Sequence, residues 1–182
     1  MLTWADLQTH VANDELVRWT WNGKPPPADG RALYMVPNVC EEFQRAPWPG
    51  SDGERPQQTA ERRAAMRQVL ERYVRGKNLL IRRDIKELGS EPIRKHMRGY
   101  WEFRSQGRME ETRLFGFFAR PGAFVATCFA GRGTFGAQED WDARRKACEQ
   151  IWLRIFPNHS WLKDPWPVLL KSNLENYLNS ED

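Results

Sequence analysis

Three arginines in the middle of the chain, Arg104, Arg113 and Arg132, are the side chains whose type and position best suit chemistry on an anion. Arginine stays charged at neutral pH, and its planar guanidinium group can donate paired hydrogen bonds to a phosphate. Arg104 ends one expected strand, Arg113 begins the next and Arg132 follows the third. Because the end of one antiparallel strand lies beside the start of the next, we expect Arg104 and Arg113 to lie close together. The place of Arg132 depends on strand register.

The same arginines also have a structural interpretation. Glu102 alternates with the apolar residues of the first expected strand, and Glu110 and Glu111 precede the second. Exposed arginines that pair with these three carboxylates would explain the pattern without any bound ligand. Both interpretations are open at this point.

Other kinds of chemistry have little support in the sequence. There is no P-loop, dinucleotide-binding fingerprint, nucleophile elbow or metal-ligand spacing, so we expect no metal and no cofactor. The glycine-rich segment from Gly131 to Gly136 follows a strand of the expected meander, and we interpret it as a connection between a strand and a helix. Cys40, Cys128 and Cys148 are odd in number and widely spaced, which favours reduced, structural thiols.

The elements that must hold the arginines form an expected β-meander. Apolar and polar residues alternate over residues 100–104, and apolar runs follow at 112–119 and 123–130. Gly107 and the pair Pro121-Gly122 lie between these strands as turn signals. We therefore expect three consecutive antiparallel strands.

Helices and one earlier strand surround this meander. A short apolar run at residues 32–36 predicts a buried strand, and helical periodicity predicts helices over 59–75 and 140–156. A last helix is expected to begin at Asp164, with Pro165 in its first turn. The sequence thus predicts an α+β fold: a small, mostly antiparallel sheet, made of the meander and an N-terminal strand, packed against helices.

Length and composition indicate one folded domain. The chain has 182 residues, of which 40% are hydrophobic and 29% charged, enough to bury a core. We expect a core at residues 32–156, an N-terminal extension at 1–31 with a helix and a proline-rich connector, and a C-terminal helix at 157–182. The mean hydropathy is −0.75. No apolar run approaches the ~18 residues of a membrane span and no signal peptide pattern occurs, so we expect a cytoplasmic protein without a membrane partner.

Positive charge is concentrated in the centre of the chain. The net charge is +4 overall. Residues 54–113 contain 16 Lys and Arg against 9 Asp and Glu, a net charge of +7, while the remainder carries 12 against 15, a net charge of −3. An excess of arginine indicates an anionic partner, although a solvated helix face accounts equally well for the basic residues between Arg62 and Arg75.

A series of short motifs between residues 84 and 148 resembles a known family. They are Ile85-Lys86-Glu87-Leu88-Gly89, Tyr100-Trp101-Glu102-Phe103-Arg104, the segment TRLFGFF at 112–118, the apolar strand at 123–129, and Gly131-Arg132 before the last long helix. In this order and spacing the stretch resembles the RelE/HigB-like toxin superfamily, in particular its phage-derived HigB-like branch. The resemblance implies a RelE-like fold.

The resemblance also implies an activity and partners. Such toxins are metal-independent endoribonucleases that cleave mRNA, usually on the translating ribosome, and each pairs with an antitoxin, here expected to carry a helix-turn-helix. By position, Arg104, Arg113 and Arg132 would hold the scissile phosphate. Glu102 and His96 are the candidates for the general base, ahead of Tyr100 and Lys95. The residues expected to contact RNA around this site are Lys86, Arg94, Lys95, Arg98 and Tyr100.

The chain departs from the family pattern at two motifs. Gly116, Phe117 and Phe118 stand where many relatives have a tyrosine, and Gly131-Arg132 replaces a pair of lysines. The alternative function is therefore a catalytically inactive RelE-like protein of a phage or mobile element, which binds nucleic acid or a host protein. A separate alternative is an interaction module, in which exposed aromatics such as Trp48, Trp161 and Trp166 mark a protein interface.

Overall fold

A six-stranded mixed sheet organises the fold. The computed structural model describes residues 1–21, 23, 30–45, 48, 56–90, 92–105, 111–135 and 137–170, without the side chains of residues 90, 92–94 and 138. The strands are β1 (Val17–Arg18), β2 (Ala32–Met35), β3 (Ile85–Glu87), β4 (Trp101–Arg104), β5 (Thr112–Arg120) and β6 (Ala123–Gly131). The α-helices are α1 (Trp4–Ala12), α2 (Pro37–Gln44), α3 (Pro56–Val74), α4 (Gln138–Ile155) and α5 (Trp166–Leu169). Short 3-10 helices are η1 (Leu88–Ser90), η2 (Pro92–Met97) and η3 (Arg132–Thr134).

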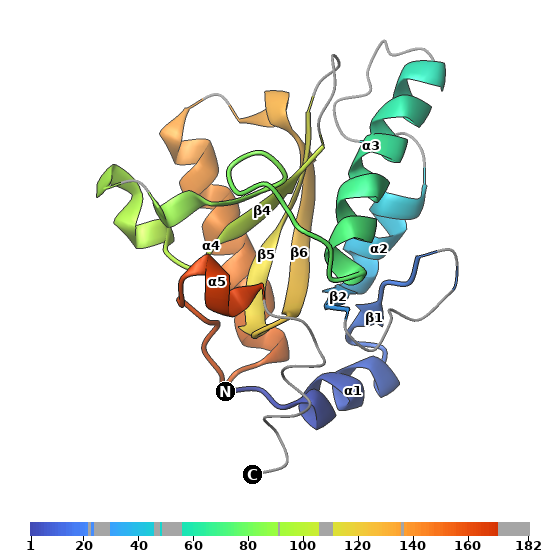
Figure 1. The fold of residues 1–182 in the computed structure, drawn as a ribbon. Helices are drawn as coiled ribbons and strands as arrows, with labels where there is room; N and C mark the ends of the chain where they lie inside the picture. Colours follow the sequence, from blue (N-terminus) through green and yellow to red (C-terminus); the bar gives the residue numbers. More distant parts are fainter. Residues whose placement is uncertain are drawn as a thin grey trace.

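The strand order across the sheet is β1-β2-β6-β5-β4-β3. The expected meander is present, because β4, β5 and β6 pair as consecutive antiparallel strands. β2 pairs with β6 in parallel, with α2 and α3 in the connection between β2 and the meander (Figure 1). The α+β prediction is therefore confirmed, but the expected sheet was too small. β1 and β3 extend it at its two edges.

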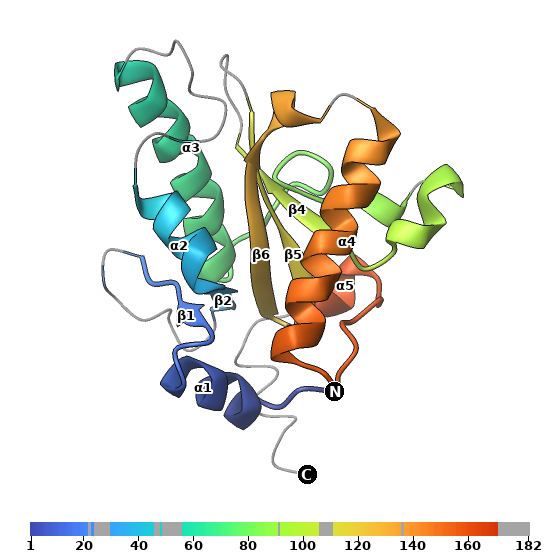
Figure 2. The same cartoon turned by 180° about the vertical axis from the view of Figure 1, so that it is seen from behind.

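Helices cover both faces of the sheet, which gives three layers (Figures 1 and 2). On one face Tyr73 of α3 packs edge-on against Phe103 of β4, at a ring-centroid distance of 5.0 Å. On the other face Trp152 of α4 packs against Phe117 of β5 at 5.6 Å. Strand β5 contributes apolar side chains to both layers, with Phe118 near Tyr73 and Phe117 near Trp152, since successive side chains point to opposite faces.

The N-terminal segment is part of the sheet and the core. Thr3 caps α1 with a capping box that includes Asp6. β1 pairs with β2, and Leu2, Leu7 and Leu16 are buried in the same hydrophobic cluster as the sheet. The division expected at residue 31 therefore does not separate an extension from the core.

The helix bounds differ from the sequence predictions at three places, one of which is α4, where residues 140–156 were expected. α3 begins at Pro56 and ends at Val74, where residues 59–75 were expected. α5 begins at Trp166, so Pro165 is the residue that precedes the helix and not part of its first turn. The remainder of the expected C-terminal helix, residues 171–182, lies outside the described residues. No helix in the described ranges has both the length and the apolar character that crossing a bilayer requires.

Candidate functional site

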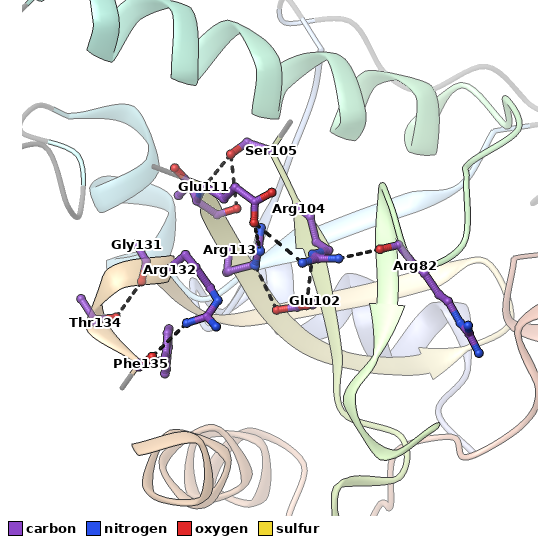
Figure 3. A network of polar contacts seen from close by, with 11 residues as sticks. Arg82, Glu102, Arg104, Ser105, Glu111, Arg113, Gly131, Arg132, Thr134 and Phe135 are labelled. Carbon is purple, nitrogen blue, oxygen red and sulfur yellow. Dashed lines mark hydrogen bonds and ion pairs between the residues drawn. The ribbon is translucent and has the colours of Figure 1, made fainter. Parts of the chain in front are cut away.

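Four charged side chains, from β4, β5 and the residue before β5, meet on one face of the sheet (Figure 3). In the register of these strands Arg104 lies opposite Arg113, and Glu102 lies opposite Phe115. Glu102, Arg104 and Arg113 therefore share the face that α4 covers, because Phe115 packs against Trp141 of α4 on that side. Glu111 directly precedes β5. We call Glu102, Arg104, Glu111 and Arg113 the Glu102 cluster.

Each carboxylate in the Glu102 cluster contacts both arginines. Glu102 Oε1 lies 3.3 Å from Arg104 Nε, and Glu102 Oε2 lies 3.3 Å from Arg113 Nε. Glu111 Oε2 pairs with Arg113 Nη2 and lies 3.7 Å from Arg104 Nη2. Arg104 Nη1 also donates to the carbonyl oxygen of Arg82 at 2.6 Å, which fixes its direction. The expected proximity of Arg104 and Arg113 is confirmed, as is their pairing with Glu102 and Glu111; Glu110 lies outside the described residues.

The Glu102 cluster has a buried half and a half that reaches solvent. Residues Glu102 and Arg113 are 2% and 0% exposed, whereas the side chains of Arg104 and Glu111 are 24% and 34% exposed. Arg113 is therefore not the exposed arginine that the structural interpretation expected. Ion pairs this deeply buried carry a large desolvation cost, which the two arginines and two carboxylates offset for one another.

Burial also changes proton affinities within the cluster. It raises the pKa of Glu102 above the ordinary value of 4.5, although the positive charges of Arg113, Arg104 and Lys86 oppose the shift. Lys86 acts from β3, where it is the register partner of Glu102. Burial likewise lowers the pKa of the Arg113 guanidinium. A carboxylate with a raised proton affinity beside two guanidinium groups can accept a proton next to a bound anion.

Arg132 lies at the same end of the sheet but its side chain points elsewhere. Thr112 of β5 pairs with Gly131 of β6, and the Arg132 amide donates to the Glu111 carbonyl oxygen at 2.7 Å. The Arg132 guanidinium, however, donates to the carbonyl oxygen of Phe135 at 2.9 Å and lies over the Trp141 ring (Figure 3). The strand register therefore places the backbone of Arg132 beside the Glu102 cluster. The exposed side chain of Arg132 points away and is not part of the cluster.

The other predicted site residues are dispersed. His96 Nε2 lies 2.8 Å from Asp142 Oδ1 of α4, on an exposed surface and outside the Glu102 cluster. Lys95 and Arg98 are exposed on and after η2 and can contact an external partner. The side chain of Arg94 lies outside the described part of the chain.

Tyr100 cannot bind RNA at the surface as predicted. It is 1% exposed, its ring stacks on Phe115 at 5.6 Å, and its hydroxyl lies 3.3 Å from Cys148 Sγ. Burial raises its pKa well above the ordinary value. The prediction was wrong because the register of β4 turns Tyr100 inward beneath α4, which local alternation does not reveal.

Comparison with known proteins gives no relative: no family model, no curated protein and no solved structure matches this chain. Within the described residues, no group of three or more His, Cys, Asp or Glu side chains is arranged to hold a metal ion. The candidate site therefore rests on the geometry of the Glu102 cluster.

Proposed function

We propose that this protein is a metal-independent endoribonuclease, the toxin of a toxin–antitoxin pair of the RelE/HigB kind, which cleaves mRNA on the ribosome. The observation that carries the proposal is the Glu102 carboxylate held between the guanidinium groups of Arg104 and Arg113. RNA cleavage without a metal needs a base for the 2′-hydroxyl and cations for the phosphorane, and these residue types supply both.

In the proposed reaction the 2′-oxygen of a nucleotide attacks the adjacent phosphorus while Glu102 accepts the hydroxyl proton. Arg104 and Arg113 stabilise the added charge on the phosphorane oxygens. The bond to the 5′-oxygen then breaks, and that oxygen takes up a proton from Glu102 or water. The products are a 2′,3′-cyclic phosphate and a 5′-hydroxyl.

The substrate must enter through the exposed half of the Glu102 cluster. Arg104 and Glu111 reach solvent, whereas Arg113 lies beneath them. A phosphate that approaches Arg104 competes with the Glu111 carboxylate for Arg113, because both anions accept paired hydrogen bonds from a guanidinium group. Exchange of Glu111 for the phosphate is therefore the first step of binding.

A second candidate function is nucleic-acid or host-protein binding without cleavage. Its specific support is that Glu102 and Arg113 are buried and already neutralise each other. Exposed basic residues near the β3 edge can still contact phosphates without chemistry. These residues are Arg82, Arg83, Lys95 and Arg98.

Cleavage of purified mRNA in the presence of EDTA, with and without ribosomes, tests the proposal. Arg104→Ala should reduce the cleavage rate by about 10²-fold, the usual loss for one donor to a transition-state oxyanion. Arg145→Ala is the matched control, because Arg145 is also partly buried and pairs with Glu149 on α4. Equal rates for the two variants contradict the proposed site. Salt-sensitive RNA binding by the wild type without any cleavage supports the second candidate.

A further inference from the structure

We propose that Cys128 and Cys148 form a dithiol site that reacts with hydrogen peroxide in a small cavity between β6 and α4. The cavity has a volume of about 110 Å³. Its wall includes both cysteines together with Thr127, Arg144, Asn38 and Glu42. This volume accommodates a molecule the size of hydrogen peroxide beside a few waters.

The sheet is irregular where it borders the cavity. Phe115 of β5 pairs with Cys128, but the next residue, Gly116, pairs with Ala126, so Thr127 is an additional residue in β6. Such a β-bulge redirects the side chains around it. Thr127 and Cys128 both line the cavity below α4, and the residue Thr127 is buried.

The surroundings of Cys148 favour its thiolate. Burial alone would raise its pKa, but hydrogen bonds from the thiol of Cys128 and from Tyr100, together with the charge of Arg144, hold the pKa below the ordinary value of 9.0. Tyr100 Oη lies 3.3 Å from Cys148 Sγ. The hydrogen bond to Cys148 and burial raise the pKa of Cys128. Within the pair, the surroundings therefore favour the thiolate on Cys148 and the proton on Cys128.

The reaction balances with hydrogen peroxide as the only co-reactant. The Cys148 thiolate attacks one peroxide oxygen, the O–O bond breaks, and hydroxide leaves as Cys148 becomes a sulfenic acid. The Cys128 sulfur then attacks the sulfur of Cys148, the S–O bond breaks, and the Cys128 proton leaves with that oxygen as water. One thiolate and one thiol are oxidised to one disulfide, and the peroxide is reduced to one hydroxide and one water.

Cys40 provides an internal comparison. It is buried in α2, where burial and the neighbouring Glu41 raise its pKa. Gln44 Nε2 lies 3.2 Å from its sulfur. Cys40 therefore has the burial of the other two cysteines without an arginine that favours its thiolate, and we expect it to stay reduced.

Peptide mass mapping of the full chain after treatment with about one equivalent of hydrogen peroxide tests this proposal. We expect a disulfide between Cys128 and Cys148, with Cys40 still a thiol. Cys128→Ser should stop the reaction at a Cys148 sulfenic acid that dimedone traps. Arg144→Ala should slow the oxidation by about tenfold, which corresponds to roughly 1.4 kcal/mol, and Arg144→Lys should restore most of the rate.

Cys40→Ser is the matched control and should oxidise at the rate of the wild type. The proposal is overturned if Cys40 is oxidised as fast as Cys148. It is also overturned if the Arg144→Ala variant is oxidised at the same rate as the wild type. If Cys128→Ser does not fold, Cys148→Ser gives the complementary test, because Cys128 should then resist peroxide. None of these measurements involves RNA, so their outcome is independent of the proposed ribonuclease activity.

Discussion

At the scale of single residues, the Glu111 carboxylate pairs with Arg113, where the proposed function requires a phosphate to bind. Glu111→Gln removes this negative charge but keeps a side chain of the same size. We expect the affinity for single-stranded RNA to rise by about tenfold, because a charge-assisted contact to Arg113 no longer competes. Fluorescence anisotropy with a labelled RNA at fixed salt measures this effect.

Glu71→Gln is the control for that variant. Glu71 also pairs with an arginine, Arg75, and is partly exposed, but it lies on α3 away from the Glu102 cluster. Its replacement should leave RNA affinity nearly unchanged. If the Glu111→Gln variant binds RNA no more tightly than the wild type, the proposed exchange of Glu111 for a phosphate at Arg113 is contradicted.

The raised pKa of Glu102 makes stability depend on pH. The folded protein holds the Glu102 proton more tightly than the unfolded chain, so the contribution of Glu102 to the free energy of unfolding decreases as pH rises above 4.5 through the raised pKa. Glu102→Gln lacks this titration. We therefore expect the unfolding free energy of the wild type to fall relative to that of Glu102→Gln as the pH rises above 4.5. Urea denaturation at several pH values measures this difference, and a constant difference refutes the assignment.

The sequence predicted some residue positions and not others for a physical reason. Arg104 and Arg113 flank one hairpin connection, so any antiparallel register brings them close. The burial of Arg113 depends on the layer that α4 adds, and the direction of the Arg132 side chain depends on its contact with Trp141. These are contacts between distant segments, which local patterns do not encode.

At the scale of elements, the pairing of β5 and β6 depends on Gly116. A Cβ atom at this position would lie 2.0 Å from the carbonyl oxygen of Val125 and 2.9 Å from Ala126 Cα. Both contacts are with backbone, which cannot move without disturbing the bulge at Thr127. No side chain therefore fits at Gly116 without displacing this backbone.

Gly116→Ala should therefore destabilise the protein by about 3 kcal/mol, at the upper end of overpacking effects. Thermal unfolding followed by circular dichroism measures the loss. A melting temperature equal to that of the wild type would show that β5 and β6 do not approach each other this closely.

Local patterns predicted the long elements and missed the short ones. The three meander strands have alternating or continuously apolar residues, and α3 has clear helical periodicity. β3 has three residues and β1 has two, too few to establish a period. β3 nevertheless determines where Lys86 lies relative to Glu102, so part of the electrostatics of the site was not accessible from sequence pattern.

At the scale of the whole molecule, the parallel pairing of β2 with β6 joins segments about ninety residues apart. No local signal specifies such a pairing, and it encloses the core between α2 and α3 on one face and α4 on the other. The same arrangement leaves β3 at the edge of the sheet beside the exposed half of the Glu102 cluster. The proposed substrate path therefore follows from the global topology.

The most direct test of the ribonuclease proposal is sequencing of RNA 5′ ends from cells that express the wild type or Glu102→Gln. We predict growth arrest and new 5′ ends at in-frame codon positions for the wild type. Both effects should disappear for Glu102→Gln when circular dichroism shows that this variant folds. Identical RNA ends in the two strains, or no new ends with the wild type, would contradict the account.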